Sequence, residues 1–454
     1  MNRPERRATS ALATIYALRM LGLFLILPVF ALYAEGLAGT TPVLVGVAIG
    51  IYGLTQAALQ IPFGMVSDHI GRKPVILFGL ALFAAGSGVA AEAETIHGVI
   101  AGRALQGAGA IAAAVLALAA DLTREESRLR AMAIIGITIG VAFSASLVLG
   151  PLLDRWMGVP GLFWLTAVLA VAGMGVLVFA VPAERGHRVH RDAEAVPGQF
   201  ARVLRDPELL RLDAGIFLLH LGLTATFVAL PLVLRDQLAL APVHHGWLYL
   251  PVMVIAFAAM IPFIIIAEKQ RRMRTVFLGA IAAVAVAAAG LGLAGQAGTL
   301  AGVALALLVY FTAFNLLEAS LPSLIAKAAP AGAKGTAMGV YSSAQFLGAF
   351  TGGVAGGWAH GAAGAEGVFG LIAGAAAVWW LLARGMAPPH YLSSHVVAIP
   401  ADADPAALTP RLAAVAGVAE VEVVPEEGAA YLKVELDRLD REGLAAATGQ
   451  PSTA

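Results

Sequence analysis

Four ionisable side chains lie inside apolar stretches of this chain that are long enough to cross a lipid bilayer. They are Arg19, Arg103, His220 and Glu318. Placing such a group at the centre of a membrane helix costs about 2.5–3.5 kcal/mol on insertion scales, and residues retained at this cost are usually functional. A carboxyl group or an imidazole in such a place can bind and release a proton near neutral pH. The set therefore indicates proton chemistry inside a membrane.

Glu318 is the strongest candidate for the proton-binding group, and Asn315 lies one helical turn before it. Removal from water disfavours the charged form of a side chain, so burial keeps a proton on a carboxyl group and takes one from an imidazole. The guanidinium groups of Arg19 and Arg103 do not deprotonate in proteins. Two alternatives stay open: Glu318 as a neutral group hydrogen-bonded to a neighbouring helix, and His220 as a structural residue.

A charged segment lies between two apolar runs, each of about 20 residues, which is the length that spans a bilayer as a helix. It covers residues 64–73 and reads GMVSDHIGRK. We expect a short hairpin at a membrane surface, in which glycine permits a tight turn and the final basic pair marks the cytoplasmic side. A segment that only sets orientation would need neither the acid nor the glycines. The residues assigned to its function are Gly64, Asp68, Gly71, Arg72 and Lys73.

Residues 64–73 resemble the signature loop between helices 2 and 3 of the major facilitator superfamily, whose pattern is G-x-x-x-D-x-x-G-R-[RK]. The resemblance implies a conformational latch that closes the cytoplasmic side of a transporter. In this latch Asp68 faces the positive start of helix 11, near residues 335–337, and Arg72 pairs with Asp121 at the end of helix 4. A carboxylate at a helix start contributes about 0.3–1 kcal/mol when exposed and up to about 2 kcal/mol when partly buried.

Residues 102–110, which read GRALQGAGA, are similar to the R-x-x-Q-G-x-G-A motif of helix 4 in the same superfamily. This similarity implies that Arg103 lies in the cavity and takes part in proton transfer, approaching Glu318 in one state. The alternative is a structural Arg103 that is satisfied by helix carbonyl groups. Helix 5 keeps only part of the glycine pattern of antiporters, because Gly150 and Pro151 are followed by LLDR.

The composition is that of a membrane protein. Of the 454 residues, 59% are hydrophobic and 13% are charged, against about 25% charged residues in soluble domains. The chain has no cysteine, which excludes disulfides and thiolate metal sites. No nucleotide-binding loop is found in the sequence. We therefore expect no enzyme, no cofactor, no resident metal and no nucleic-acid partner.

Twelve apolar segments can be drawn, and the connections between them alternate in charge. Arg155 and Arg235 are the cations in the connections after odd-numbered segments, while Lys and Arg concentrate in the other connections. This alternation predicts an even number of helices, with both termini in the cytoplasm. The segments are 11–33, 44–65, 74–92, 98–120, 130–153, 161–182, 211–234, 246–267, 275–296, 299–325, 335–360 and 366–385.

The segments form two six-helix halves, at residues 1–182 and 211–386, which is the architecture that supports alternating access around a midplane site. The polar linker at 183–210 is expected to lie along the cytoplasmic face as a partial amphipathic helix. Residues 387–454 read as β-α-β-β-α, a small ferredoxin-like domain. Without cysteine, this tail is not expected to bind heavy metals. The predicted strands and helices of the tail are 396–399, 405–416, 418–424, 429–436 and 438–447.

Charge suggests a role for the tail. It has four Lys and Arg residues against ten Asp and Glu residues, whereas the cytoplasmic rim is rich in cations, among them those of residues 269–274. Opposite potentials favour docking that depends on ionic strength. We expect a regulatory tail, and the alternative is a tail that only aids folding or assembly.

The resemblance, tail included, implies a twelve-helix all-α carrier of the bacterial inner membrane, of the drug:proton antiporter type. Its partners would be a small amphipathic or hydrophobic solute, protons and the lipid bilayer, and we expect a monomer. Two alternatives are a proton-coupled importer and a membrane-anchored sensor whose tail signals.

Overall fold

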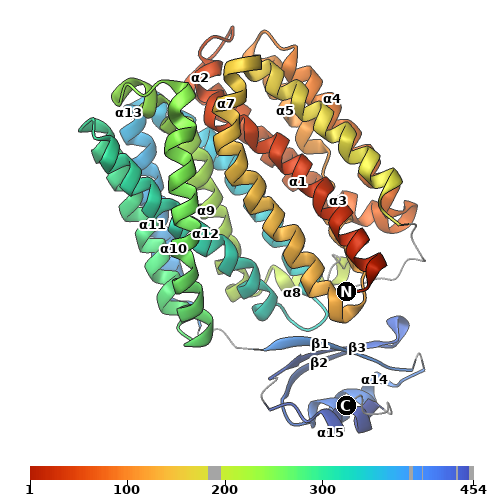
Figure 1. Ribbon diagram of the computed structural model, residues 1–454. Coiled ribbons are helices and arrows are strands. Elements are labelled where there is room, and N and C mark those ends of the chain that lie inside the picture. The colour runs from red at the N-terminus through yellow and green to blue at the C-terminus, as the bar shows by residue number, and fades with distance from the viewer. Residues whose placement is uncertain (183–195, 388–391, 401, 436–437, 449–454) are drawn as a thin grey trace.

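The computed structural model describes residues 1–182, 196–387, 392–400, 402–435 and 438–448. A bundle of long helices has a small sheet at one end (Figure 1). We call the end next to the sheet the tail side and the opposite end the far side; the N-terminus lies on the tail side. The long helices and their neighbours are α1 (Arg3–Leu25), α2 (Leu27–Ala34), α3 (Pro42–Ile70), α4 (Arg72–Ala91), α5 (Ile96–Ala108), α6 (Ala112–Asp121), α7 (Glu125–Phe179), α9 (Pro207–Leu232), α10 (His245–Lys269), α11 (Met273–Gln296), α12 (Leu300–Ala328) and α13 (Lys334–Ala383).

Ten stretches within the described residues are long and apolar enough to cross a membrane, and two of these, of 50 residues each, hold two spans. The backbone of α7 leaves helical geometry at Gly158, and that of α13 does so at Ala363 and Gly364. Figure 1 shows the two arms of α7 meeting in a sharp bend on the far side. A straight helix of 50 residues would measure about 75 Å, far more than a bilayer requires. Divided at these bends, the stretches confirm the twelve predicted spans.

α5 and α6 are separated by a break at Gly109, whose carbonyl group accepts a hydrogen bond from the buried Arg19. Gly109 leaves helical geometry with ψ at 55°, so the helical ladder is interrupted there. A Cβ at this position would overlap the carbonyl oxygen of Gly79 on α4, so the close approach requires glycine.

The linker between the halves is described only from residue 196 onward, and residues 183–195 lie outside the described part. It contains the turn η1 (Pro197–Gln199) and the four-residue helix α8 (Phe200–Val203). The described helix covers a small part of the linker, and the expected amphipathic helix otherwise falls outside the described residues. α9 then starts four residues before the predicted boundary, because the Asp206 side chain caps it by accepting hydrogen bonds from two backbone N–H groups of its first turn.

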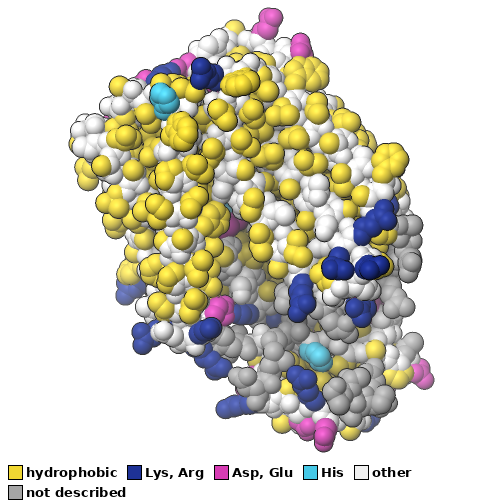
Figure 2. Space-filling view, in the orientation of Figure 1, with side chains coloured by type: hydrophobic (Ala, Val, Ile, Leu, Met, Phe, Trp, Pro, Cys, Tyr) yellow, Lys and Arg dark blue, Asp and Glu magenta, His cyan; other side chains and the backbone are white. Residues whose placement is uncertain are grey.

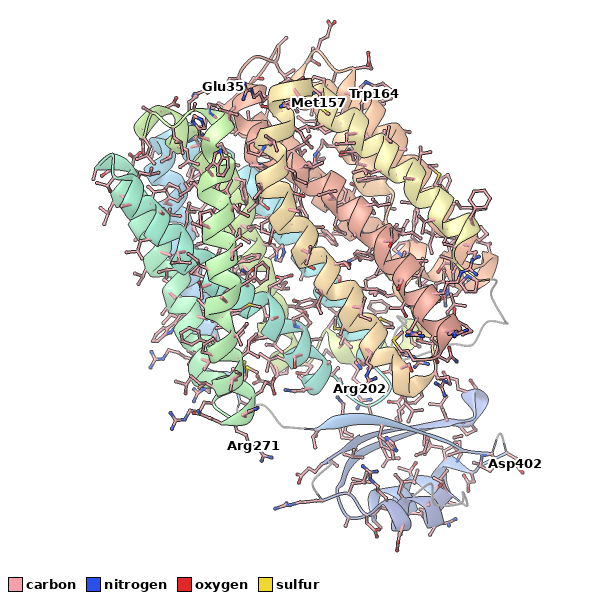
Figure 3. The ribbon with its side chains drawn as sticks, in the orientation of Figure 1. Glu35, Met157, Trp164, Arg202, Arg271 and Asp402 are labelled. Carbon is pink, nitrogen blue, oxygen red and sulfur yellow. The ribbon has the colours of Figure 1, made fainter. Side chains whose placement is uncertain are left out.

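On the far side the two halves pack closely. Gly46 of α3 faces Gly353 of α13, and a Cβ on either glycine would overlap the backbone opposite. Such contacts between small residues are typical of membrane helices. Arg235, in the π-helical turn η2 (Val233–Gln237) that follows α9, also binds both carboxylate oxygens of Glu35, at 2.5 and 3.0 Å. Figure 3 labels Glu35 at this end of the bundle.

Toward the tail side the two halves separate. The halves are still joined by a hydrogen bond from Gln60 Nε2 on α3 to Ser343 Oγ on α13, at 2.9 Å. Figure 2 nevertheless shows a recess between the halves on this side. The side chain of Glu318 is 35% exposed although it lies well inside α12. The structure is therefore closed on the far side and open to solvent between the halves.

The tail is a small α+β domain, as predicted. Its sheet is antiparallel with the strand order β1-β3-β2, which is the order of a ferredoxin-like sheet over the described residues. Gly428, in the left-handed region with φ at 62°, closes the hairpin between the last two strands. The elements are β1 (Ser393–Ala398), α14 (Pro405–Ala413), β2 (Val418–Val424), the turn η4 (Pro425–Glu427), β3 (Ala429–Val434) and α15 (Arg441–Thr448).

Candidate functional site

Glu318, His220 and Gln345 meet inside the C-terminal half. The amide nitrogen of Gln345 on α13 donates to Glu318 Oε1 on α12 and to His220 Nε2 on α9, each at 3.0 Å. Glu318 Oε2 lies 3.8 Å from His220 Nε2. A primary amide has two N–H donors, so Gln345 satisfies both groups at once. An imidazole that accepts this hydrogen bond is neutral.

This cluster contains buried atoms that could bind a proton. Glu318 Oε2 and His220 Nδ1 are buried atoms with no hydrogen-bond partner among the described residues. A proton on the imidazole would turn Nε2 into a donor toward Glu318 Oε2, while a proton on Glu318 would remove its charge. The nearby Asn315 is buried, and its Nδ2 is also unpartnered in the described structure. Glu318 is hydrogen-bonded to a neighbouring helix, as one alternative expected, and its side chain is more exposed than expected for a buried carboxyl group.

Arg19 lies in the N-terminal half, where it is 1% exposed. It donates to Gln56 Oε1 at 2.8 Å and to the Gly109 carbonyl at 3.0 Å, which is the carbonyl at the break between α5 and α6. Its guanidinium carbon also lies 5.8 Å from the centre of the Tyr52 ring and 5.4 Å from that of Phe83, at the distance of cation–π contacts.

Arg103 is fixed by backbone carbonyl groups. It is 2% exposed and donates to the carbonyl oxygens of Ala48 and Ile49 at 3.2 and 3.1 Å and to Gln106 Oε1 at 3.1 Å. All its described hydrogen bonds therefore stay within the N-terminal half. In this conformation Arg103 does not approach Glu318, and the arrangement matches the structural alternative.

The charged segment contains less loop than predicted. α3 continues through Ile70, and only Gly71, with φ at 96°, separates it from α4. The expected hairpin is thus a helix end followed by a one-residue turn that favours glycine. At Gly64, a Cβ would lie 3.0 Å from the Cβ of Ala113 on α6, so glycine permits a close approach there.

Arg72 organises the polar groups around this turn. It is fully buried, pairs with Asp68, donates to Ser67 Oγ at 2.7 Å, and lies 3.4 Å from Asp121 Oδ2. The structure thus brings Arg72 and Asp121 together, as expected. Lys73 donates to the carbonyl of Val181 at 2.8 Å, which ties the turn to the end of α7.

The start of α13 has a different partner in this conformation. Thr336 is fully buried, and its hydroxyl accepts a hydrogen bond from the backbone N–H of Val196 at 2.8 Å. Asp68 pairs instead with Arg72. The contact between Asp68 and this helix start therefore remains a prediction for the other state, in which the tail side is closed.

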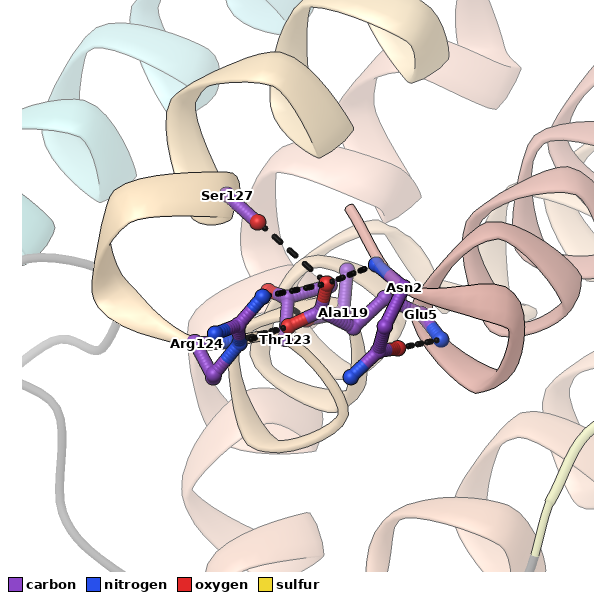
Figure 4. A network of polar contacts seen from close by, with 6 residues as sticks. All are labelled: Asn2, Glu5, Ala119, Thr123, Arg124 and Ser127. Atoms are coloured by element: carbon purple, nitrogen blue, oxygen red, sulfur yellow. Dashed lines mark hydrogen bonds and ion pairs between the residues drawn. The ribbon is translucent and has the colours of Figure 1, made fainter.

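A network at the N-terminus was not predicted (Figure 4). Glu5 is 3% exposed and accepts hydrogen bonds from Arg124 Nε at 2.8 Å, from the Arg124 backbone N–H at 3.1 Å and from Ser127 Oγ at 3.3 Å. Asn2 and Glu5 also form a capping box at the start of α1. The network ties α1 to α7 beside the turn that Arg72 organises.

The tail contacts the C-terminal half and the linker. Lys433 of β3 is 2% exposed and donates to the last carbonyl groups of α12, those of Ala326 and Lys327, at 2.7 and 3.2 Å. Glu422 of β2 accepts from Arg202 of the linker at 3.2 Å. Figure 3 shows Arg202 between the bundle and the sheet. This described ion pair involves the linker rather than the basic turn at residues 269–274.

Comparison with known proteins agrees with this architecture. Residues 12–353 match the sequence family described as Major Facilitator Superfamily. The chain belongs to this superfamily. It is 49% identical to the inner membrane transport protein YajR of Escherichia coli, over 95% of this chain and 94% of that protein. It is 27% identical to the multidrug resistance protein MdtH of Aeromonas salmonicida, over 81% and 91% of the two chains.

A solved structure supports the fold. The human organic anion transporter MFSD10 matches 84% of this chain with a TM-score of 0.60 at 22% identity, and this likeness concerns the fold alone. The superfamily and the apolar helices together show a multi-pass membrane transporter of small molecules, and not an enzyme.

Asp213, Tyr341 and Gln345 were missed by the sequence analysis, although all three lie close to the predicted site. Asp213 is about two helical turns before His220, at a spacing of seven residues that puts both on one face of α9. Tyr341 is one turn before Gln345 on α13. The spacing from His220 was a signal that could have been used.

Proposed function

We propose that this transporter is a proton-driven antiporter that exports a small amphipathic solute, with Glu318 as its proton-coupling group. The observation that carries the proposal is the contact of Glu318 with His220 and Gln345 at the recess between the halves. A carboxyl group that is open to solvent in one state and enclosed in the other can load and release a proton on opposite sides. The similarity to a protein named for multidrug resistance supports the class of solute.

We propose further that the tail side faces the cytoplasm, with both termini there and the protein acting as a monomer. The basic residues Arg72 and Lys73 lie on this side, in accord with the positive-inside tendency. On this assignment the structure is open to the cytoplasm. Glu318 then releases its proton into the recess as solute enters, and the Gln345 amide stabilises the resulting carboxylate.

Closure of the cytoplasmic side requires that the start of α13 changes its partner. In the proposed cycle Asp68 replaces Val196 at this helix start, where the helix dipole favours a negative charge. In the same step of the proposed cycle, the halves separate between α3 and α13 on the periplasmic side. The Arg235–Glu35 pair there is half exposed, and such pairs contribute only about 0–1 kcal/mol, so it opposes opening weakly.

The tail is proposed to regulate this closure. Lys433 and Glu422 hold the tail on α12 and on the linker, and the same linker donates to Thr336 at the start of α13. A docked tail therefore favours the cytoplasm-open state. The alternative is a tail that is needed only for folding or assembly. It predicts the same contacts but no effect of the tail on the transport cycle.

A proton-coupled importer is the second candidate. The observation that favours it is the incomplete antiporter pattern, since LLDR follows Gly150 and Pro151. Counterflow in inverted vesicles separates the two, because an antiporter accumulates solute in acidified vesicles and a symporter expels it. A sensor would show no transport in either direction.

The test starts with a thermal-shift screen of the purified protein against a panel of metabolites and drugs. The solute that stabilises the protein most is then followed in proteoliposomes under an imposed pH gradient. We expect wild-type transport to depend on the gradient and Glu318→Gln to lose this dependence while it still binds the solute. Gradient-driven transport by Glu318→Gln at the wild-type rate would contradict the proposal.

A further inference from the structure

Asp213 is a buried carboxyl group for which the transport cycle described above has no use. It lies on α9, is 6% exposed, and both of its carboxylate oxygens lack a hydrogen-bond partner among the described residues. The neighbouring cation on its helix, Arg211, pairs with Glu208. An ionised carboxylate buried without a partner costs several kcal/mol. A bound proton would remove this charge.

The packing of α9 against α13 places Asp213 close to the Glu318 cluster. The two helices run side by side in constant register, with Gly348 against Phe217 and Gly352 against Leu221. Continued by one turn from Phe217 toward the tail side, this register brings Asp213 beside residues 341–345 of α13.

Tyr341 lies on α13 one turn before Gln345, which contacts Glu318, and within the segment that the register places beside Asp213. It is 3% exposed, and its hydroxyl has no hydrogen-bond partner in the described structure. A phenol hydroxyl has a single proton to donate. It can therefore stabilise only one of the two carboxylates at a time.

The other charged or titratable groups on α9, α12 and α13 have partners of their own or lie near the tail-side ends of these helices. Arg211 is paired with Glu208, and Lys327 on α12 is paired with Glu268. His220 faces Glu318 and Gln345. The remaining groups of this kind near the tail-side ends of α9, α12 and α13 are Lys334 and Arg384.

We propose that Asp213 is a second proton-binding site, coupled to Glu318 through the hydroxyl of Tyr341. When Glu318 loses its proton, the hydroxyl turns to that carboxylate and Asp213 keeps its own proton. When Glu318 is protonated, the hydroxyl is available to Asp213, whose proton can then leave. Ionisation of both acids at once would place two charges around one donor, so the pair retains at least one proton near neutral pH. The inference rests on the proposed role of Glu318 and adds a second acid to it.

The first test measures protonation without any solute. Dicyclohexylcarbodiimide reacts with protonated carboxyl groups in apolar surroundings, and the modified residues are quantified by peptide mass spectrometry of the full-length protein in nanodiscs across a pH series. We expect Asp213 and Glu318 to be modified at neutral pH, and the exposed Glu94 on the far side to remain unmodified. An Asp213 that stays unmodified across the whole pH series while Glu318 reacts would overturn the proposal.

The second test measures the coupling. Asp213→Asn removes both the competing acceptor and the possible second charge, so Glu318 should lose its proton more readily. We expect the pH at which half of Glu318 is modified to fall by about one unit, a tenfold change in proton affinity. In a Tyr341→Phe background the same substitution should have little effect, because the connecting hydroxyl is gone. An equal shift in both backgrounds would overturn the role of Tyr341.

The two proposals can fail separately. If Glu318→Gln retains transport driven by a pH gradient, the proposed function fails whatever the labelling shows. If Glu318→Gln loses it while Asp213 is never labelled, only the second site fails. Asp213→Glu is the conservative variant, which should be labelled at the introduced carboxyl and should restore the coupling that Asp213→Asn removes.

Discussion

The two halves of this transporter place different kinds of charged group within their predicted spans. In the spans of the N-terminal half the buried charged groups are Arg19 and Arg103, which donate to carbonyl and amide oxygens and have no carboxylate partner in the described structure. The spans of the C-terminal half contain Asp213, His220 and Glu318, whose polar atoms are only partly satisfied.

The charge in the N-terminal half is therefore fixed, whereas the charge in the C-terminal half can change with protonation. An arginine keeps its proton, so the N-terminal cations cannot report the presence of a proton and instead hold α1, α3 and α5 together. A carboxyl group or an imidazole changes charge, so the C-terminal cluster can. We infer that the C-terminal half binds and releases the proton, and that the N-terminal half is the rigid body against which the C-terminal half moves. The predictions below test this division, starting with the largest expected effect.

Glu318→Gln should abolish transport driven by a pH gradient while it leaves solute exchange in place, because the amide keeps the size and the hydrogen bond to Gln345 but cannot ionise. The measurement is solute uptake in proteoliposomes with and without the gradient. His220→Asn is the matched control and should cost less. If His220→Asn loses gradient-driven transport and Glu318→Gln keeps it, the imidazole is the proton carrier.

Arg103→Lys should destabilise the protein without uncoupling it. A lysine keeps the charge but cannot reach the Ala48 and Ile49 carbonyl groups together with Gln106, so two of the three hydrogen bonds are lost, at about 1–3 kcal/mol for each buried acceptor left unpaired. Thermal unfolding in detergent measures the loss. The dependence of transport on pH in the surviving protein should match the wild type, and a lost dependence would contradict the division between the halves.

Asp68→Asn should favour the cytoplasm-open state, because a neutral side chain loses the attraction to the start of α13 in the closed state. The expected bias is about 0.3–2 kcal/mol, and turnover should fall more than solute affinity. Spin labels at the exposed positions Arg130 and Lys269 report the separation of the halves on the tail side. Glu94→Gln, on the far side, is the control. Unchanged distance distributions in Asp68→Asn would remove the latch from the account.

Lys433→Ala should loosen the tail and shift the balance of states by about 1 kcal/mol, the contribution of a typical hydrogen bond. The result would be a modest change in turnover and in its response to salt. Truncation after Pro389 should act in the same direction and leave basal transport in a correctly inserted protein. Arg441→Ala, on the exposed surface of the tail, is the control. Complete loss of transport from an inserted truncation would contradict a regulatory role.

Much of the fold and part of the site followed from the sequence. Span lengths and the alternation of Arg and Lys were enough for twelve helices, because both reflect the thickness and polarity of a bilayer. Arg72 and Asp121 were paired through a motif. Glu318 and His220 were found because ionisable groups are rare in such helices.

Other features depended on detail that the sequence pattern does not carry. Asp213 is two residues inside the start of the predicted span at 211–234, and α9 begins a turn earlier, after the Asp206 cap, so the acid lies further from the helix end than the sequence indicated. Arg103 carried the superfamily motif, but only the packing of α5 on α3 decides which carbonyl groups it meets. Gln345 is uncharged, so a search for ionisable residues passed over it.

The most direct test of the central claim measures proton movement that is driven by solute. Proteoliposomes carry a pH-sensitive dye inside, no pH gradient is imposed, and the solute selected by the thermal-shift screen is added outside. As solute enters, an antiporter should expel protons, so the interior should become alkaline with the wild type and with Arg103→Lys, and should not change with Glu318→Gln. Acidification of the interior, or an unchanged alkaline response in Glu318→Gln, would contradict the account.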